Sequence, residues 1–152
     1  MRARQLPSVT DSLIVGTDMN TKLLIVDDHA NTRELIRKFL DMPGLTFREC
    51  ASGTEAVACA REFQPDWVTM DLEMPGLDGF DSTIALRQEC PGARVMIVTS
   101  YNDPHFRQRA HAVGAVGYIL KENILALRLM FESQSHNLQP PLSAPGSFGS
   151  TR

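Results

Sequence analysis

Short apolar runs alternate with longer amphipathic stretches through the middle of the chain. The runs cover residues 23–26, 45–50, 67–70, 95–98 and 116–120. The first, third and fourth are continuous enough for strands buried on both faces, whereas the second alternates as an edge strand does. This pattern is typical of a parallel sheet flanked by helices.

Helix signals lie in the first two gaps between these runs. Asn31 is a candidate N-cap ahead of apolar positions at helical spacing. Those positions are Leu35, Ile36, Phe39 and Leu40. Ser52 and Glu55 have the spacing of a capping box, in which each side chain bonds the backbone near the other. We therefore expect one helix from about residue 31 and a second from about residue 52.

The later gaps carry three further helix signals. Gly79 opens a third helix with Ile84 and Leu86 facing inward. Asp103, followed by a proline, suits the cap and first position of a fourth helix, and Asn123 is placed to cap a fifth. The chain thus contains five strand–helix units.

Five such units predict the fold class. Right-handed crossovers on both faces favour an α/β, doubly wound, five-stranded parallel sheet of the flavodoxin-like kind, (βα)₅, with strand order 2-1-3-4-5. We expect one domain over residues 21–132. Residues 1–20 are expected to be an extension, and residues 133–152, rich in Pro, Ser and Gly, a disordered tail.

Composition and charge narrow the function. The chain has 152 residues, of which 43% are hydrophobic, which fits one core. Its formal net charge of −3 gives no basic surface, so we expect no direct nucleic-acid partner. The three cysteines lack the spacing of a zinc site, and no run approaches the ~20 apolar residues of a membrane span. The expected location is the cytoplasm.

The candidate chemistry lies where the predicted strands end. In open parallel α/β sheets, ligands bind beyond the carboxyl ends of the strands. Asp27 and Asp28 follow the first strand, Asp71 the third, Thr99 ends the fourth and Lys121 follows the fifth. Three carboxylates, a hydroxyl and an ammonium are therefore predicted to meet in one crevice.

Three clustered carboxylates stay ionised together only when a cation joins them, and hard oxygen ligands suit Mg²⁺. Mg²⁺ binds one or two carboxylates together with phosphate oxygens, so one carboxylate is left free to react. Lys121 and Thr99 are suited to holding phosphate oxygens. An aspartate can itself be the nucleophile and form an acyl phosphate. The set predicts phosphoryl transfer to an aspartate.

Four stretches resemble the response-regulator receiver domain. They are LLIVDD at 23–28, MDLEMPGLDG at 70–79, VTS at 98–100 and GYILK at 117–121. The resemblance covers about residues 21 to 132. Glu122 follows Lys121 at a position where the family often has proline. In this respect the chain is similar to receivers usually joined to a helix-turn-helix DNA-binding domain.

The resemblance implies that Asp71 accepts a phosphoryl group from a histidine kinase or a histidine phosphotransfer protein. It implies that the Mg²⁺ ligands are Asp28, Asp71 and the main-chain carbonyl of Glu73, with Asp27 acting through a metal-bound water. Lys121 and Thr99 would contact the phosphate. Such a protein catalyses only its own phosphorylation and dephosphorylation, so we expect no other enzyme activity.

The resemblance also implies a switch. Thr99 would move toward the phosphate and Tyr118 would turn inward behind it. The face built from the fourth helix, fifth strand and fifth helix would then change and bind an unknown downstream protein. The 20 residues after the fifth helix contain nothing that could form a recognition helix.

Two alternatives stay open. In the first, the chain is an unphosphorylated interaction or dimerisation module, for example the receiver fragment of a DNA-binding transcriptional regulator. In the second, it is a haloacid-dehalogenase-like phosphatase. Those phosphatases need a second aspartate two positions after the first, where this chain has Glu73. The four histidines, including His29, have no metal-ligand spacing and are expected to be solvated polar positions.

Overall fold

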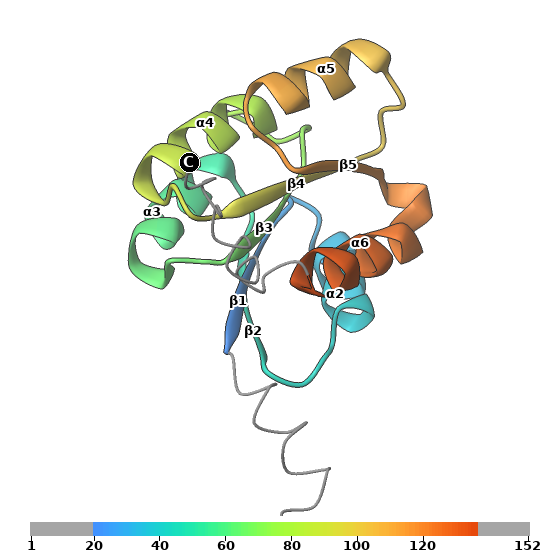
Figure 1. Ribbon diagram of the computed structural model, residues 1–152. Coiled ribbons are helices and arrows are strands. Elements are labelled where there is room, and N and C mark those ends of the chain that lie inside the picture. The colour runs from blue at the N-terminus through green and yellow to red at the C-terminus, as the bar shows by residue number, and fades with distance from the viewer. Residues whose placement is uncertain (1–19, 137–152) are drawn as a thin grey trace, which may run out of the picture.

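The computed structural model describes residues 20–136, which form a five-stranded parallel sheet with helices on both faces (Figure 1). The strands are β1 (Thr21–Val26), β2 (Leu45–Cys50), β3 (Trp67–Met70), β4 (Arg94–Thr99) and β5 (Gly117–Leu120). All neighbouring strands pair in parallel, and the order is β2-β1-β3-β4-β5. The predicted fold class and strand order are confirmed.

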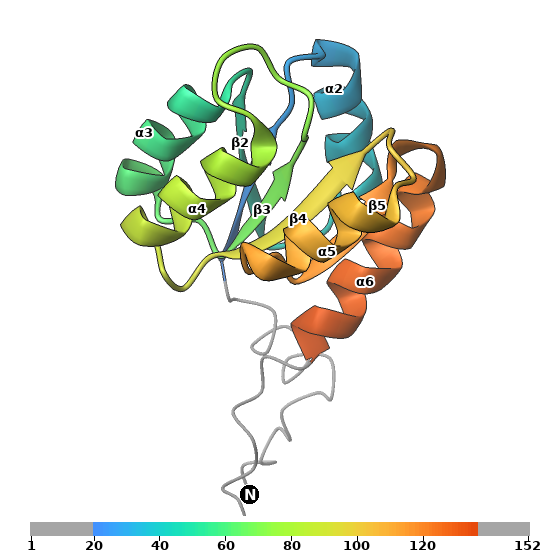
Figure 2. The ribbon, with the colours of Figure 1, turned by 90° about the horizontal axis from the view of Figure 1, so that it is seen from above.

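Within residues 20–136, four α-helices connect the strands, and a short 3₁₀ turn and a fifth α-helix follow β5. The helices are α2 (Ala30–Phe39), α3 (Gly53–Phe63), α4 (Gly79–Glu89), α5 (Pro104–Ala112) and α6 (Ile124–His136), with the 3₁₀ turn η1 (Lys121–Asn123) before α6. Helices α3, α4 and α5 cover one face of the sheet, and α2 and α6 cover the other (Figure 2).

Alternation along the strands divides the core into these two layers. In β1, Leu24 and Val26 pack with α3 and α4, whereas Leu23 and Ile25 pack with α2 and α6. All four side chains are at most 1% exposed. Successive strand residues point to opposite faces, so an uninterrupted apolar run is what a strand between two helix layers requires. The edge strand β2 alternates, as expected.

Two of the predicted helix N-caps are observed, and one prediction was wrong. The Ser52 side chain accepts the backbone N–H of Glu55 at 3.2 Å, and the Glu55 carboxylate accepts the backbone N–H of Ala51 at 3.0 Å. Asp103 caps α5 as predicted. The prediction of Asn31 as N-cap was wrong, because α2 already begins at Ala30.

One predicted inward position is exposed instead, since Ile84 on α4 is 43% exposed, whereas Leu86 is fully buried. Leu35, one of the apolar positions at helical spacing on α2, is 42% exposed. Residues two apart lie on different sides of a helix, so Ile84 and Leu86 cannot both face the sheet. Helix α6 reaches His136, beyond the predicted domain end at residue 132.

The rest of the predicted extension and tail, residues 1–19 and 137–152, lies outside the described residues. Within residues 20–136, no helix is both long and apolar enough to cross a membrane.

The single tryptophan lies far from the carboxyl ends of the strands. Trp67 begins β3, is 1% exposed and packs against Phe131 with 5.0 Å between ring centroids. Asp71 follows it by four residue steps along an extended strand, which is about 13 Å at ~3.3 Å per residue. Its fluorescence therefore reports the packing of α6 on the sheet more directly than events at Asp71.

A close backbone contact at the start of α4 gives the first prediction. A Cβ on Gly79 would lie 2.1 Å from the main-chain oxygen of Asp71 and 2.8 Å from the Cα of Leu72. Because backbone cannot move aside as a side chain can, we expect Gly79→Ala to lower the free energy of unfolding by about 1–3 kcal/mol. Urea unfolding measures this. Gly92→Ala, where nothing lies within 4 Å, is the matched control and should change stability far less.

Candidate functional site

The acidic site lies at the carboxyl edge of the sheet, where backbone bonds fix two of its aspartates. The backbone N–H of Asp71 donates to the carbonyl of Val26 at 3.0 Å, and that of Asp27 donates to the carbonyl of Cys50 at 3.1 Å. These bonds continue the strand ladders one residue past β1 and β3. Both carboxylates are held where neighbouring strands end, and each residue is 1% exposed.

Lys121 joins the two buried carboxylates from the end of β5. Its Nζ lies 2.8 Å from Oδ2 of Asp27 and 3.4 Å from Oδ1 of Asp71. The Lys121 side chain is 18% exposed. The predicted meeting of Asp27, Asp71 and Lys121 at one edge is therefore what the fold produces, with Asp28 and Thr99 placed at the same edge.

Burial, and to a lesser extent the charge of Asp27, raise the pKa of Asp71 from its ordinary 3.8 to about 6, against the opposing effect of Lys121. Burial by itself lowers the pKa of Lys121, but the hydrogen bond to Asp27 and the charge of Asp71 outweigh it, so the pKa of Lys121 is raised. The carboxylates thus hold the lysine charged, while Asp71 carries unfavourable charge at neutral pH.

The site fits a divalent cation. Neither carboxylate oxygen of Asp71 has a hydrogen-bond partner among the described residues, although its side chain is 1% exposed. Three carboxylates against one ammonium leave −3 + 1 = −2 on Asp27, Asp28, Asp71 and Lys121. Buried carboxylate oxygens without donors are ligands for a hard cation, which would supply the missing positive charge.

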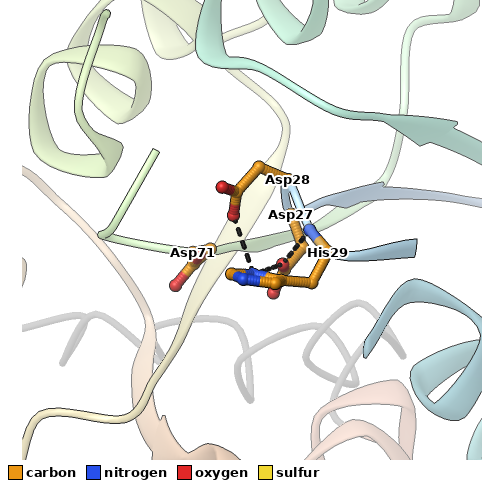
Figure 3. A group of neighbouring side chains, drawn as sticks. All are labelled: Asp27, Asp28, His29 and Asp71. Atoms are coloured by element: carbon orange, nitrogen blue, oxygen red, sulfur yellow. Dashed lines mark hydrogen bonds and ion pairs between the residues drawn. The ribbon is translucent and has the colours of Figure 1, made fainter. Parts of the chain in front are cut away.

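His29 is the site residue that sequence reasoning missed. Its Nδ1 lies 3.0 Å from Oδ1 of Asp28 and 3.3 Å from Oδ1 of Asp27. Figure 3 shows its ring lying beside the three carboxylates, and one ligand atom each from Asp27, Asp28, His29 and Asp71 lie within 4.8 Å of one another. As expected for a solvated position, the His29 side chain is 65% exposed. Its contacts with the two aspartates were not expected. The sequence signal that pointed to His29 as a site residue was its position directly after Asp28.

Thr99 and Tyr118 are connected through the backbone of Tyr101. The hydroxyl of Thr99, which is fully buried at the end of β4, accepts the backbone N–H of Tyr101 at 3.2 Å. The hydroxyl of Tyr118 donates to the carbonyl of the same residue at 2.5 Å. The predicted switch pair therefore holds one loop residue from both sides, although the switch motion itself stays a prediction.

Tyr101 also connects the loop after β4 to the loop after β3. Its hydroxyl donates to the carboxylate of Glu73, two residues after Asp71. Its ring packs edge-on against Phe106 of α5, which in turn packs edge-on against Phe80 of α4. The role of the Glu73 carbonyl as a metal ligand stays a prediction.

The Tyr101–Glu73 contact gives a second prediction. The hydrogen bond to Glu73 raises the pKa of the Tyr101 hydroxyl, so Glu73→Ala should lower that pKa toward 10. Because the chain has only two tyrosines, phenolate absorbance in a Tyr118→Phe background reports Tyr101 alone. Glu122→Ala is the matched control and should leave the titration unchanged. An unchanged titration in Glu73→Ala would show that the bond does not form in solution.

Comparison with known proteins agrees with this geometry. A family model described as "Response regulator receiver domain" matches residues 23–130. The chain is 37% identical over 122 residues to "Response regulator GacA" of Pseudomonas syringae pv. syringae, covering 76% of this chain and 57% of that protein. It is 37% identical over 105 residues to "Response regulator protein VraR" of Staphylococcus aureus, covering 68% of this chain and 50% of that protein. The chain thus spans about half the length of these curated relatives.

Solved structures show the same architecture. A LuxR-family two-component response regulator from Aurantimonas sp. SI85-9A1 superimposes with a TM-score of 0.72 at 33% identity, covering 78% of this chain and 86% of that chain. Vibrio cholerae chemotaxis protein CheY4 superimposes with a TM-score of 0.66 at 29% identity, covering 76% of this chain and 97% of that chain.

Proposed function

Because the chain belongs to the response regulator receiver domain family, we propose that Asp71 accepts a phosphoryl group from a histidine kinase or a histidine phosphotransfer protein. One observation carries the proposal: Asp71 is 1% exposed, its oxygens have no hydrogen-bond partner among the described residues, and Lys121 lies 3.4 Å away. A buried carboxylate with so few donors keeps lone pairs available for attack, and the lysine can neutralise incoming phosphate.

In the proposed reaction, a carboxylate oxygen of Asp71 attacks the phosphorus of phosphohistidine. The oxygen–phosphorus bond forms as the nitrogen–phosphorus bond breaks, and the imidazole leaves. Lys121 holds one phosphoryl oxygen, and the hydroxyl of Thr99 donates to another. Phosphoryl transfer needs mainly positioning and charge neutralisation, which these fixed side chains supply. The chain acts only on its own aspartate, during both phosphorylation and hydrolysis.

Mg²⁺ is the proposed cofactor, because three of the four donor groups that meet at the site are carboxylates. Asp28, Asp71 and the main-chain carbonyl of Glu73 would hold it, with Asp27 contributing through a water molecule. When bound, the ion neutralises charge on the phosphoryl oxygens.

The proposed output surface comprises α5, β5 and α6, which correspond to the predicted fourth helix, fifth strand and fifth helix. Once phosphate draws Thr99 toward Asp71, the Tyr101 segment moves with it, since Thr99 accepts the N–H of Tyr101. Tyr118, which donates to the carbonyl of Tyr101, then turns inward and alters the surface that a downstream protein binds. That protein, and the absence of direct nucleic-acid binding, stay predictions, as does the cytoplasmic location.

Acetyl phosphate with Mg²⁺ tests the proposed phosphorylation. Intact mass of the wild-type protein should rise by one phosphoryl group, and Asp71→Asn should abolish the gain. Asp41→Asn, which changes an exposed aspartate outside the site, is the matched control and should gain phosphate as the wild type does. Equal gain in Asp71→Asn would disprove the assignment of the acceptor. A wild type that stays unmodified would favour an interaction module instead.

The length of the relatives supports a second candidate. The chain covers 57% of GacA and 50% of VraR, so each of these relatives is about twice as long as the part that it shares with this chain. One matched structure, of which this chain covers 97%, is described as a DNA-binding response regulator of the LuxR family from Staphylococcus aureus. In that role phosphorylation would control an attached DNA-binding domain. Sequencing the encoding transcript to its ends distinguishes the two candidates. The family membership argues against the phosphatase alternative.

A further inference from the structure

We propose that His29 contributes a nitrogen ligand to a metal ion bound at the acidic site. The site would then bind first-row transition ions such as Zn²⁺ more tightly than a site with oxygen ligands alone would. The inference rests on the proposed function, because it concerns the same cation site. It adds a donor of different chemistry to the carboxylates, and with it a different preference among divalent ions.

The spacing of the donor atoms supports ligation. Two ligands at right angles around an ion, each about 2.1 Å away, lie about 3 Å from one another. The Nδ1 of His29 lies 3.0 Å from Oδ1 of Asp28 and 3.3 Å from Oδ1 of Asp27. The donor group including Asp71 fits within 4.8 Å, which is close to the separation of opposite ligands on one ion.

Burial and orientation give an independent reason for a cation at this place. Asp71 is 1% exposed, and its ion pair among the described residues is the 3.4 Å contact of its Oδ1 with Nζ of Lys121. It lies beside His29 in Figure 3. A buried carboxylate in this condition lacks a positive partner on the side away from Lys121, and an ion held by His29 and Asp28 would fill that side.

At the start of α2, the ring of His29 contacts Asp27 and Asp28 and has no capping role in the helix. It is the N-cap residue of α2, but its side chain makes no capping bond. The backbone, not the ring, is fixed, since its N–H donates to Oδ1 of Asp27 at 2.8 Å. With 65% of the side chain exposed, the ring can accept an ion from solvent at little cost to the fold.

Imidazole nitrogen changes ion preference. Mg²⁺ favours oxygen ligands and gains little from a nitrogen, whereas Zn²⁺ and its neighbours bind imidazole strongly. We therefore expect His29→Ala to weaken Zn²⁺ binding far more than Mg²⁺ binding. The ratio of the Mg²⁺ to the Zn²⁺ dissociation constant should fall at least tenfold.

The direct test is long-range ¹H–¹⁵N NMR of the imidazole rings, with Zn²⁺ alone as the probe. One equivalent of Zn²⁺ should shift the ring nitrogens of His29, whose signals are identified by their loss in His29→Ala. His105→Ala, which removes an exposed histidine of α5, is the matched control and should keep the shift. Competition between Zn²⁺ and Mg²⁺, followed by calorimetry, gives the ratio.

Two results would overturn the inference: His29 ring signals that do not move when Zn²⁺ is saturating, or a ratio of constants that is the same in His29→Ala and wild type. Failure of the proposed function looks different. In that case wild-type protein gains no phosphate from acetyl phosphate and Mg²⁺, whatever happens to the His29 signals.

Discussion

Asp71→Asn is expected to stabilise the metal-free protein at neutral pH by about 1–3 kcal/mol, although it removes the proposed reactive group. Burial raises the pKa of Asp71 to about 6 from an ordinary 3.8. At about 1.4 kcal/mol per pKa unit, the ionised carboxylate costs the folded state up to about 3 kcal/mol. The buried amide of the variant needs partners of its own, so the net gain is smaller.

The gain should depend on pH in a defined direction. A carboxyl group whose pKa is raised on folding favours the folded state while it is protonated, below pH 3.8, and loses that contribution as the pH rises through about 6. The stability difference between Asp71→Asn and wild type should therefore be full above pH 6 and vanish toward pH 4. Urea unfolding in EDTA at several pH values measures it.

Mg²⁺ should reduce this difference in stability. An ion at a hundred times its dissociation constant stabilises the wild type by about 2.7 kcal/mol, and the variant, which lacks one ligand, by less. Asp41→Asn should follow the wild type under all conditions. A variant less stable than the wild type in EDTA at neutral pH would mean that Asp71 is already well compensated, against the burial argument.

The second large effect is expected for Lys121→Met, which leaves Asp27 and Asp71 buried without a cation. We expect a loss of about 2–4 kcal/mol at neutral pH, below the full cost of breaking a buried ion pair because the Lys121 side chain is 18% exposed. Unfolding in EDTA measures the loss. Added Mg²⁺ should restore more stability to this variant than to the wild type. Lys38→Met, at an exposed lysine on α2, is the matched control.

Double-mutant cycles divide this loss between the two carboxylates. Lys121 lies 2.8 Å from Asp27 but 3.4 Å from Asp71, so its coupling to Asp27 should be the larger. The measurement combines Lys121→Met with Asp27→Asn in one cycle and with Asp71→Asn in the other. Equal couplings would show that the lysine is shared evenly in solution.

The fold was largely predictable because the pattern of apolar residues along the chain reflects the burial of its strands. The buried strands β1, β3 and β4 have apolar residues on both faces, and glycine, proline and aspartate mark the turns between elements. The errors concerned single positions. Asn31 lies inside α2, and Ile84 faces outward. Local patterns fix where a helix lies, but its boundaries and rotation depend on what it packs against.

The site was predictable to the extent that topology alone places it. Asp27, Asp71 and Lys121 each follow a strand, and parallel strands bring their carboxyl ends to one edge. His29 could not be found in this way. Its ring reaches the carboxylates because the backbone turns from β1 into α2 directly after Asp28, and side-chain direction at such a turn does not follow from spacing.

The sequence by itself determined the order of the elements, the buried strands and the edge at which the aspartates and Lys121 meet, since period-two and helical patterns reflect burial directly. Only the tertiary structure decided the distances within that edge, which set the closer pairing of Lys121 with Asp27 and the approach of His29 to Asp28. The raised pKa of Asp71 follows from the same arrangement. Electrostatic effects change steeply over a few ångströms, and positions along the chain do not resolve such distances.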